Sequence, residues 1–198
     1  MKLKIAGLFS LIAPVYGFFF GYQKRHYKEI LEGASCQLDF SQYKTCVDVG
    51  CGTGALCSVL RRKGLDVTGV DPARGMLQIA SRNNKGMEFV QASVVKGLPF
   101  GDKSFDISFA SYVAHGLNKE ERRAMYAEMG RITKYFVLMI DYNENRSPFV
   151  SVVEWLEGGD YFNFIKNPRS EMQEAFADVR AVDVGPRAAC YMCVPSDG

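Results

Sequence analysis

A glycine-rich loop, and an aspartate that follows it, are the residues of this chain best suited to bind a ligand. The loop runs from Val47 to Gly54 and has glycines at positions 50, 52 and 54. Such glycines let the backbone come close to a ligand, and the helix that begins after them points free N–H groups at it. Asp71 stands at the end of the next predicted strand, where a carboxylate can accept two hydrogen bonds from a ribose diol. Together they indicate an adenosine-containing ligand.

The elements that must position these residues alternate between strands and helices. Apolar runs predict strands at 43–49, 66–71, 87–91, 104–110 and 135–140, and helical spacing predicts helices at 54–63, 73–82 and 118–132. Asn118, with Glu121 three residues later, is typical of a capping box at the start of the third helix. Two more helices are expected from 147 and from 167, before strands at 179–184 and 188–194. This alternation predicts a doubly wound α/β fold.

Composition excludes several functional classes. The 198 residues are 47% apolar, so the chain can bury a core without a metal or disulfide staple. A net charge of +2 is too weak for a nucleic-acid-binding surface. The only histidines, His26 and His115, are too few for a multi-histidine metal site. Four of the six cysteines lie in apolar or glycine-rich segments, which favours a reducing compartment, the cytoplasm.

The N-terminal segment resembles a signal peptide, because basic residues precede an apolar stretch at 5–20. Gly7, Pro14 and Gly17 interrupt that stretch, it lacks a cleavage site, and it is short for a membrane span. We therefore expect residues 1–35 to form a helical lid over the ligand and residues 36–198 to form the binding domain. Contact of residues 18–26 with a membrane surface is the less favoured alternative.

The spacing of the glycines separates two classes of ligand. Dinucleotide-binding enzymes use G-x-G-x-x-G, whereas this loop reads G-x-G-x-G. With that spacing, the sequence resembles the class I S-adenosylmethionine-dependent methyltransferases. The resemblance extends over about residues 8–141 and includes the segments 69–77, 98–109 and 111–117. Residues 12–16, Ile-Ala-Pro-Val-Tyr, are similar to the entry segment of the small-molecule branch that serves quinone biosynthesis.

The resemblance implies a Rossmann-like, seven-stranded mixed sheet whose last strand pair is antiparallel, and S-adenosylmethionine as the cofactor. Asp48 and the carbonyl of Gly50 would receive the amino group of the cofactor, and Asp71 would hold its ribose. Ser93 stands where the family usually has an aspartate for the adenine. The full set of implied cofactor contacts is Tyr16, Asp48, Gly50, Cys51, Gly52, Gly54, Asp71, Pro72, Met76, Ser93 and Ser111.

Methyl transfer requires an aligned nucleophile and exclusion of water, and it requires a base only when the nucleophile carries a proton. His115, which follows the fourth strand, would suit an oxygen or nitrogen nucleophile; the alternative is a histidine that only packs a loop. Tyr112, Tyr142 and Trp155 either line the substrate pocket or belong to the core.

The expected methyl acceptor is a small organic molecule, because the chain has no appended domain to dock nucleic acid or protein. Two rival functions stay open. One is an NAD-dependent oxidoreductase. The other is a non-catalytic protein that binds S-adenosylmethionine or its demethylated product, which the missing adenine aspartate favours. The identity of the acceptor and the oligomeric state are not specified by the sequence.

Overall fold

The structure is a computed structural model that describes residues 17–32, 38–145 and 160–196. The chain divides into two compact units, Met1–Ser93 and Val94–Gly198. Three predictions fall outside the described residues: Tyr16, Trp155 and the helix expected from residue 147. Of the expected lid, 1–35, the structure describes residues 17–32.

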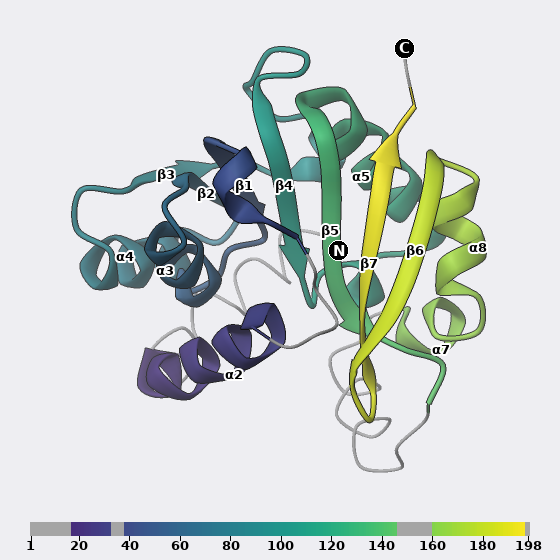
Figure 1. The fold of residues 1–198 in the computed structure, drawn as a ribbon, viewed down its shortest axis with the longest axis horizontal. Helices are drawn as coiled ribbons and strands as arrows, with labels where there is room; N and C mark the ends of the chain where they lie inside the picture. Colours follow the sequence, from purple (N-terminus) through teal and green to yellow (C-terminus); the bar gives the residue numbers. More distant parts are fainter. Residues whose placement is uncertain (1–16, 33–37, 146–159, 197–198) are drawn as a thin grey trace. The chain divides into compact units, whose positions relative to one another are not determined.

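The first unit is built on three parallel strands in the order β3-β2-β1. These are β1 (Thr45–Val49), β2 (Asp66–Asp71) and β3 (Glu88–Gln91). Helix α3 (Ala55–Arg62) connects the first two strands and α4 (Arg74–Asn83) connects the second and third (Figure 1). All five elements lie within a few residues of their predicted bounds. The carboxyl ends of β1 and β2 are paired in register, and the glycine-rich loop begins there.

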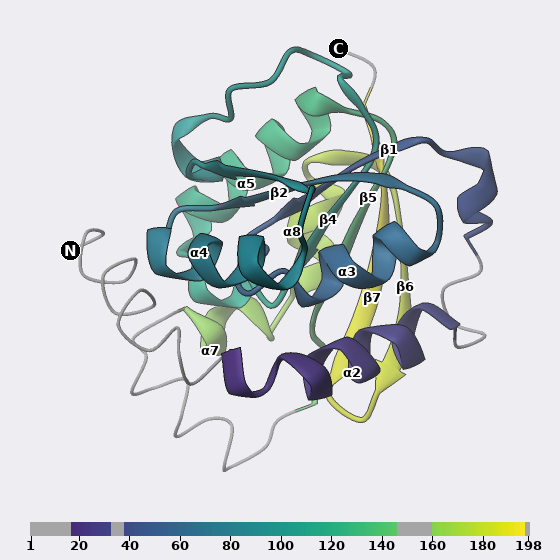
Figure 2. The ribbon, with the colours of Figure 1, turned by 90° about the vertical axis from the view of Figure 1, so that its left-hand side faces the viewer.

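A helix that the sequence places only loosely, α2 (Phe20–Glu32), precedes this sheet, followed by a single turn, η1 (Phe40–Gln42). Helix α2 runs alongside α3 (Figure 2). Its C-terminal residues Ile30 and Leu31 are buried, whereas Phe18, just before the helix, is 85% exposed. No helix of the described residues is long and apolar enough to cross a membrane.

The second unit holds four strands in the order β4-β5-β7-β6. They are β4 (Phe105–Ser111), β5 (Thr133–Tyr142), β6 (Phe176–Gly185) and β7 (Ala188–Pro195). Strands β4 and β5 are parallel, whereas β7 is antiparallel to both β5 and β6. Residues 137–140 of β5 are fully buried, as expected for an apolar run without alternation. The prediction of a seven-stranded mixed sheet with an antiparallel last pair is confirmed.

Helix α5 (Lys119–Ile132) begins with the predicted capping box: the backbone N–H of Glu121 donates to Asn118, and that of Asn118 donates to Glu121. Two short helices, α7 (Tyr161–Phe164) and α8 (Pro168–Gln173), follow β5. Single turns η2 (Val94–Lys96) and η3 (Ala114–Gly116) flank β4. The sequence pattern does not predict α7, η2 or η3, because elements of three or four residues are too short to show periodicity.

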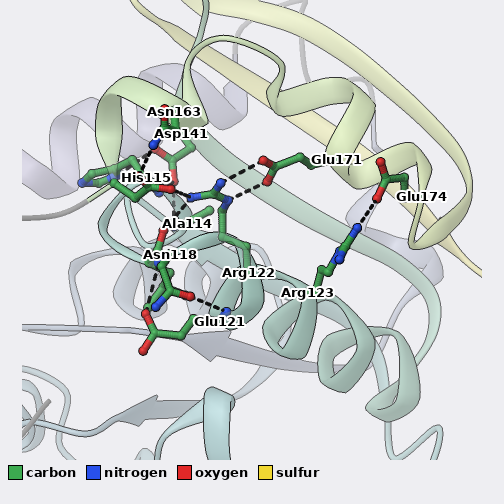
Figure 3. A network of polar contacts seen from close by, with 12 residues as sticks. Ala114, His115, Asn118, Glu121, Arg122, Arg123, Asp141, Asn163, Glu171 and Glu174 are labelled. Atoms are coloured by element: carbon green, nitrogen blue, oxygen red, sulfur yellow. Dashed lines mark hydrogen bonds and ion pairs between the residues drawn. The ribbon is translucent and has the colours of Figure 1, made fainter.

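A buried guanidinium joins α5 to α7 and α8 in the second unit. Arg122, 1% exposed, donates through Nε and Nη2 to both carboxylate oxygens of Glu171, at 2.6 and 2.8 Å (Figure 3). Its Nη1 donates to Asp160 at 2.9 Å and to the carbonyl of Leu117 at 2.6 Å. Leu117 directly follows η3, so this network also anchors the turn after β4.

We expect Arg122→Leu to lower the free energy of unfolding by about 3 kcal/mol, because it removes the buried guanidinium and leaves the partly buried carboxylates of Glu171 and Asp160 without their partner. The matched control is Arg123→Leu, which removes an exposed pair with Glu174 and should leave the free energy of unfolding nearly unchanged. Urea denaturation followed by circular dichroism measures both. Equal effects would show that the buried network contributes no more than a surface pair.

Candidate functional site

The glycine-rich loop of the first unit has a backbone that only glycine adopts easily. Gly50, Gly52 and Gly54 have φ angles of 73°, 51° and 76°. The backbone N–H groups of Gly50 and Cys51 both donate to the carbonyl of Val70, at 2.7 and 3.0 Å. These bonds hold the loop against the carboxyl end of β2, and side chains with a Cβ would be strained at the three positions.

Asp71 is the side chain that fixes this loop. Its Oδ2 accepts from the backbone N–H of Gly52 at 3.0 Å, and its Oδ1 accepts from that of Ala73 at 2.7 Å. Burial raises the pKa of Asp71, while the two backbone N–H groups act in the opposite direction. A carboxylate has about four acceptor positions. Two therefore remain for a ligand hydroxyl after the two backbone bonds.

The glycines serve different purposes. A Cβ built on Gly52 would have no atom of the described structure within 4 Å, so the loop is open there. A Cβ on Gly54 would lie 2.6 Å from Nδ2 of Asn84 and 3.2 Å from Ala80. That amide donates to the carbonyls of Gly54 and Ala80, at 3.1 Å each, and cannot move without breaking these bonds. Gly54 is thus required by packing against α4, whereas Gly52 is the position that leaves room for a ligand.

Asp48 lies fully buried beneath the loop. Its Oδ2 accepts from Sγ of Cys57 at 3.1 Å, but its Oδ1 has no hydrogen-bond partner among the described residues. Burial raises the pKa of this carboxyl to about 7; the bond from Cys57 opposes the shift and the charge of Asp71 adds to it. A buried acceptor without a partner is costly unless a ligand supplies a donor. The residues therefore fit a ligand that brings an ammonium or N–H group.

The other predicted cofactor residues of this unit have varied surroundings. The thiol of Cys51 is buried. A hydrogen bond with Cys57 is the largest single effect on its pKa and lowers it, but burial and the charges of Asp48 and Asp71 together outweigh that bond, so the pKa of Cys51 is raised. Met76 is buried and packs against Ala73 and Ile79. Pro72 is exposed, and Ser93 is half-buried after β3. The described residues contain no cluster of histidine, cysteine or carboxylate groups suited to a metal ion.

In the second unit, His115 lies in η3, which follows the carboxyl end of β4. His115 is 8% exposed, and its Nδ1 lies 2.8 Å from Oδ1 of Asp141 (Figure 3). Asp141, 2% exposed near the end of β5, also accepts from the backbone N–H groups of Ala114 at 3.0 Å and Tyr142 at 2.8 Å. Sequence reasoning missed Asp141. The available signal was a single acidic residue directly after the apolar run 135–140.

Tyrosine rings surround this imidazole. The ring centroid of Tyr142 lies 4.9 Å from that of His115, and that of Tyr112 lies 6.5 Å away. Tyr142 also contacts Tyr161 of α7, at 5.0 Å. Tyr112 has a φ of 53°, which costs free energy for a residue other than glycine, and it follows the buried Ser111 at the end of β4. The structure thus brings Tyr112 and Tyr142 together around His115.

The amino-acid sequence matches a known family model over residues 46–135, and the model is described as a methyltransferase domain. A demethylmenaquinone methyltransferase from Paenarthrobacter aurescens is 32% identical over 136 residues. The match covers 66% of this chain and 51% of that protein, so the chain spans about half the length of this relative.

Solved structures share the fold. A protein from Thermotoga maritima, described as an S-adenosylmethionine-dependent methyltransferase and possible histamine N-methyltransferase, superposes with a TM-score of 0.71 at 17% identity. The match covers 96% of this chain and 99% of that one. Human N-acetylserotonin methyltransferase, in complex with S-adenosylmethionine, gives a TM-score of 0.70 at 14% identity, over 97% of this chain and 57% of that one. At these identities the similarity establishes the fold.

The buried carboxyl of Asp48 predicts a pH dependence of stability. A pKa raised to about 7 in the folded chain means that folding favours the protonated form. The stabilisation is complete below the unfolded-state pKa, about 4, and is lost as the pH rises through about 7. We expect the free energy of unfolding to fall by about 2–4 kcal/mol between about pH 4 and pH 8 through this group.

Asp48→Asn should remove that part of the pH dependence and should be more stable than the wild type at about pH 8. Asp71 contributes in the same direction and its charge adds to the shift of Asp48, so the difference between the two proteins reports Asp48 together with its coupling to Asp71. Asp66→Asn, at the exposed start of β2, is the control. Parallel stability curves for the wild type and Asp48→Asn, measured by denaturant titration at each pH, would contradict the assignment.

Proposed function

We propose that the protein is a class I S-adenosylmethionine-dependent methyltransferase and that it transfers a methyl group to a small organic molecule. The observation that carries the proposal is Oδ1 of Asp48, a buried acceptor without a partner among the described residues, beneath a loop that is open at Gly52. S-adenosylmethionine fits these requirements, because its amino group supplies donors and its sulfonium carries a methyl group that is already a good electrophile.

In this proposal the first unit holds the cofactor. Asp48 and the carbonyl of Gly50 receive the amino group, and Asp71 accepts hydrogen bonds from the ribose hydroxyls through its remaining acceptor positions. The remaining proposed cofactor contacts are Cys51, Gly52, Gly54, Pro72, Met76, Ser93, Tyr16 and Ser111. The bonds from Asp71 to Gly52 and Ala73 keep the loop in one shape before the cofactor arrives.

The second unit supplies His115 as the base for the acceptor. The relative from Paenarthrobacter aurescens is described as acting on demethylmenaquinone, which favours a small organic acceptor over nucleic acid or protein. We place the protein in the cytoplasm, because the five cysteines of the described residues are buried free thiols. A membrane-surface contact is not part of the proposal.

Helix α2 is proposed to be the described part of a lid. The hydroxyl of Thr53, in the glycine-rich loop, donates to Oε1 of Gln23 at 3.1 Å, so α2 is tied directly to the proposed cofactor loop. Only two residues of α2, Ile30 and Leu31, are buried, and a helix with so few buried contacts opens at low cost.

We therefore expect amides of residues 20–32 to exchange hydrogen rapidly in the free protein and at least about tenfold more slowly with S-adenosylmethionine bound. Hydrogen exchange followed by mass spectrometry measures this, with the central strand β5 as the internal control. Equal protection of α2 in both states would rule out a lid.

The function is tested by incubating the purified chain with methyl-labelled S-adenosylmethionine and a panel of small metabolites. Transfer of label is the expected result. Binding without transfer to any acceptor would support the non-catalytic alternative, and binding of NAD in its place would support the oxidoreductase.

Asp71→Ala is the matched variant for the binding step. Loss of two charge-assisted hydrogen bonds, at about 1.5–3 kcal/mol each, should weaken S-adenosylmethionine by at least about a hundredfold in calorimetry. Asp66→Asn should bind as the wild type does. An unchanged affinity of Asp71→Ala would contradict the assignment of the ribose site.

A further inference from the structure

We propose that a groove between α4 and β3, within the first unit, is a second binding site. Its ligand is a small molecule with a planar apolar body and an oxyanion, carboxylate or phosphate, at each end. The groove has a volume of about 380 Å³, which lies in the range of small-molecule sites. Its lining residues are Arg74, Leu77, Gln78, Ser81, Arg82 and Phe89. The inference goes beyond the proposed function and does not depend on the reaction that the chain catalyses.

One face of α4 forms most of the groove. The five lining residues of this helix follow one another at intervals of one, three and four positions between 74 and 82, so they share one side of it. Met76 and Ala80 lie on another side of α4 and are buried. These two residues hold the helix in the unit, and the polar side chains of the groove are therefore not needed for the core.

The floor of the groove is apolar. Leu77 is 8% exposed, and Phe89 of β3 is half-buried. Phe89 is paired in the sheet with Gly69 of β2, and a Cβ built on Gly69 would lie 2.5 Å from two ring carbons of Phe89. The ring is thus seated over the glycine, against the sheet, and leaves the groove open. A planar apolar body can lie on these two side chains.

The charge of the lining is positive and uncompensated. Arg74 and Arg82 are exposed, and neither guanidinium forms a hydrogen bond or ion pair within the part of the chain that the structure describes. None of the six lining residues is acidic. Glu88 precedes Phe89 in β3, so its side chain lies on the other face of the sheet, where it accepts from the hydroxyl of Thr68 at 3.3 Å. Guanidinium groups bind carboxylates and phosphates through paired N–H donors, which makes an oxyanion the matching ligand group.

The spacing of the two arginines specifies a ligand with two charged ends. Eight helical residues separate Arg74 from Arg82, or about 12 Å along the axis. An elongated dianion places one oxyanion on each guanidinium and its body on the floor between them. Gln78 and Ser81 lie between the arginines and offer an amide and a hydroxyl to polar substituents.

The site is tested by calorimetry of the full chain at low salt, with a biphenyl that carries a carboxylate at each end. We expect a Kd of about 0.1 mM or tighter. The biphenyl with one carboxylate should bind at least about fivefold more weakly, because it engages one arginine. A flexible aliphatic dicarboxylate of the same length should also lose at least about fivefold, because it has no ring to lie on Leu77 and Phe89. The biphenyl with a phosphate at each end shows which oxyanion binds more tightly, and binding of either supports the site.

Matched variants assign the charged ends. Arg74→Gln and Arg82→Gln should each weaken the biphenyl dicarboxylate by at least about fivefold, and the double variant by at least about twenty-five-fold, because sites this far apart act additively. Arg62→Gln, at an exposed position of α3 outside the groove, is the control and should bind as the wild type does. Circular dichroism and the thermal midpoint should be unchanged in all of them, since glutamine is a good helix former.

NMR of the backbone amides locates the ligand, and we expect shifts centred on residues 74–82 and 89. Shifts centred elsewhere, an equal loss of affinity in Arg62→Gln, or no binding of either biphenyl dianion at about 1 mM would overturn the site. Equal affinity for the monoacid would overturn the two-ended ligand, and equal affinity for the aliphatic dicarboxylate would overturn the planar body. None of these measurements involves methyl transfer, so their failure leaves the proposed function standing, and a failure to find turnover leaves the groove standing.

Discussion

A carboxylate at the end of a parallel strand holds the neighbouring loop by its backbone N–H groups, and the proposed chemistry of each unit depends on this interaction. In the first unit, Asp71 at the end of β2 accepts from Gly52 in the loop that follows β1. In the second, Asp141 near the end of β5 accepts from Ala114 in the turn that follows β4. In both cases the loop belongs to the adjacent parallel strand, so the register of the sheet sets the distance between carboxylate and loop.

Both carboxylates can accept more hydrogen bonds than the backbone N–H groups donate to them. Asp71 has acceptor positions left for a ligand hydroxyl, and Asp141 uses its own to orient an imidazole. A group that shapes the loop and also serves the ligand cannot be replaced without loss of both, because the loop and the binding geometry change together. The hydrogen bonds of Arg122 stabilise the turn that contains His115, since they fix the carbonyl of Leu117 directly after that turn.

The sequence predicts the strands and the helices α3, α4 and α5 well, because buried parallel strands are continuous apolar runs, the helices have apolar residues at helical spacing, and α5 begins with a capping box. It also predicts Asp48, Asp71 and His115, which stand next to recognisable glycines or strand ends. It does not predict Asp141 as the partner of His115, because the two are 26 residues apart and only the pairing of β4 with β5 joins them. It does not predict the packing constraint on Gly54, because that constraint comes from Asn84, a contact over 30 residues that no local pattern contains.

The central claim is that the glycine-rich loop binds S-adenosylmethionine through Asp48 and Asp71 and that His115 serves the acceptor. A crystal structure with S-adenosylhomocysteine bound tests it most directly. We predict the amino group of the ligand within hydrogen-bond distance of Oδ1 of Asp48, directly or through one water, and the ribose hydroxyls on Asp71. A ligand bound elsewhere, or one that leaves Asp48 without a donor, would contradict it.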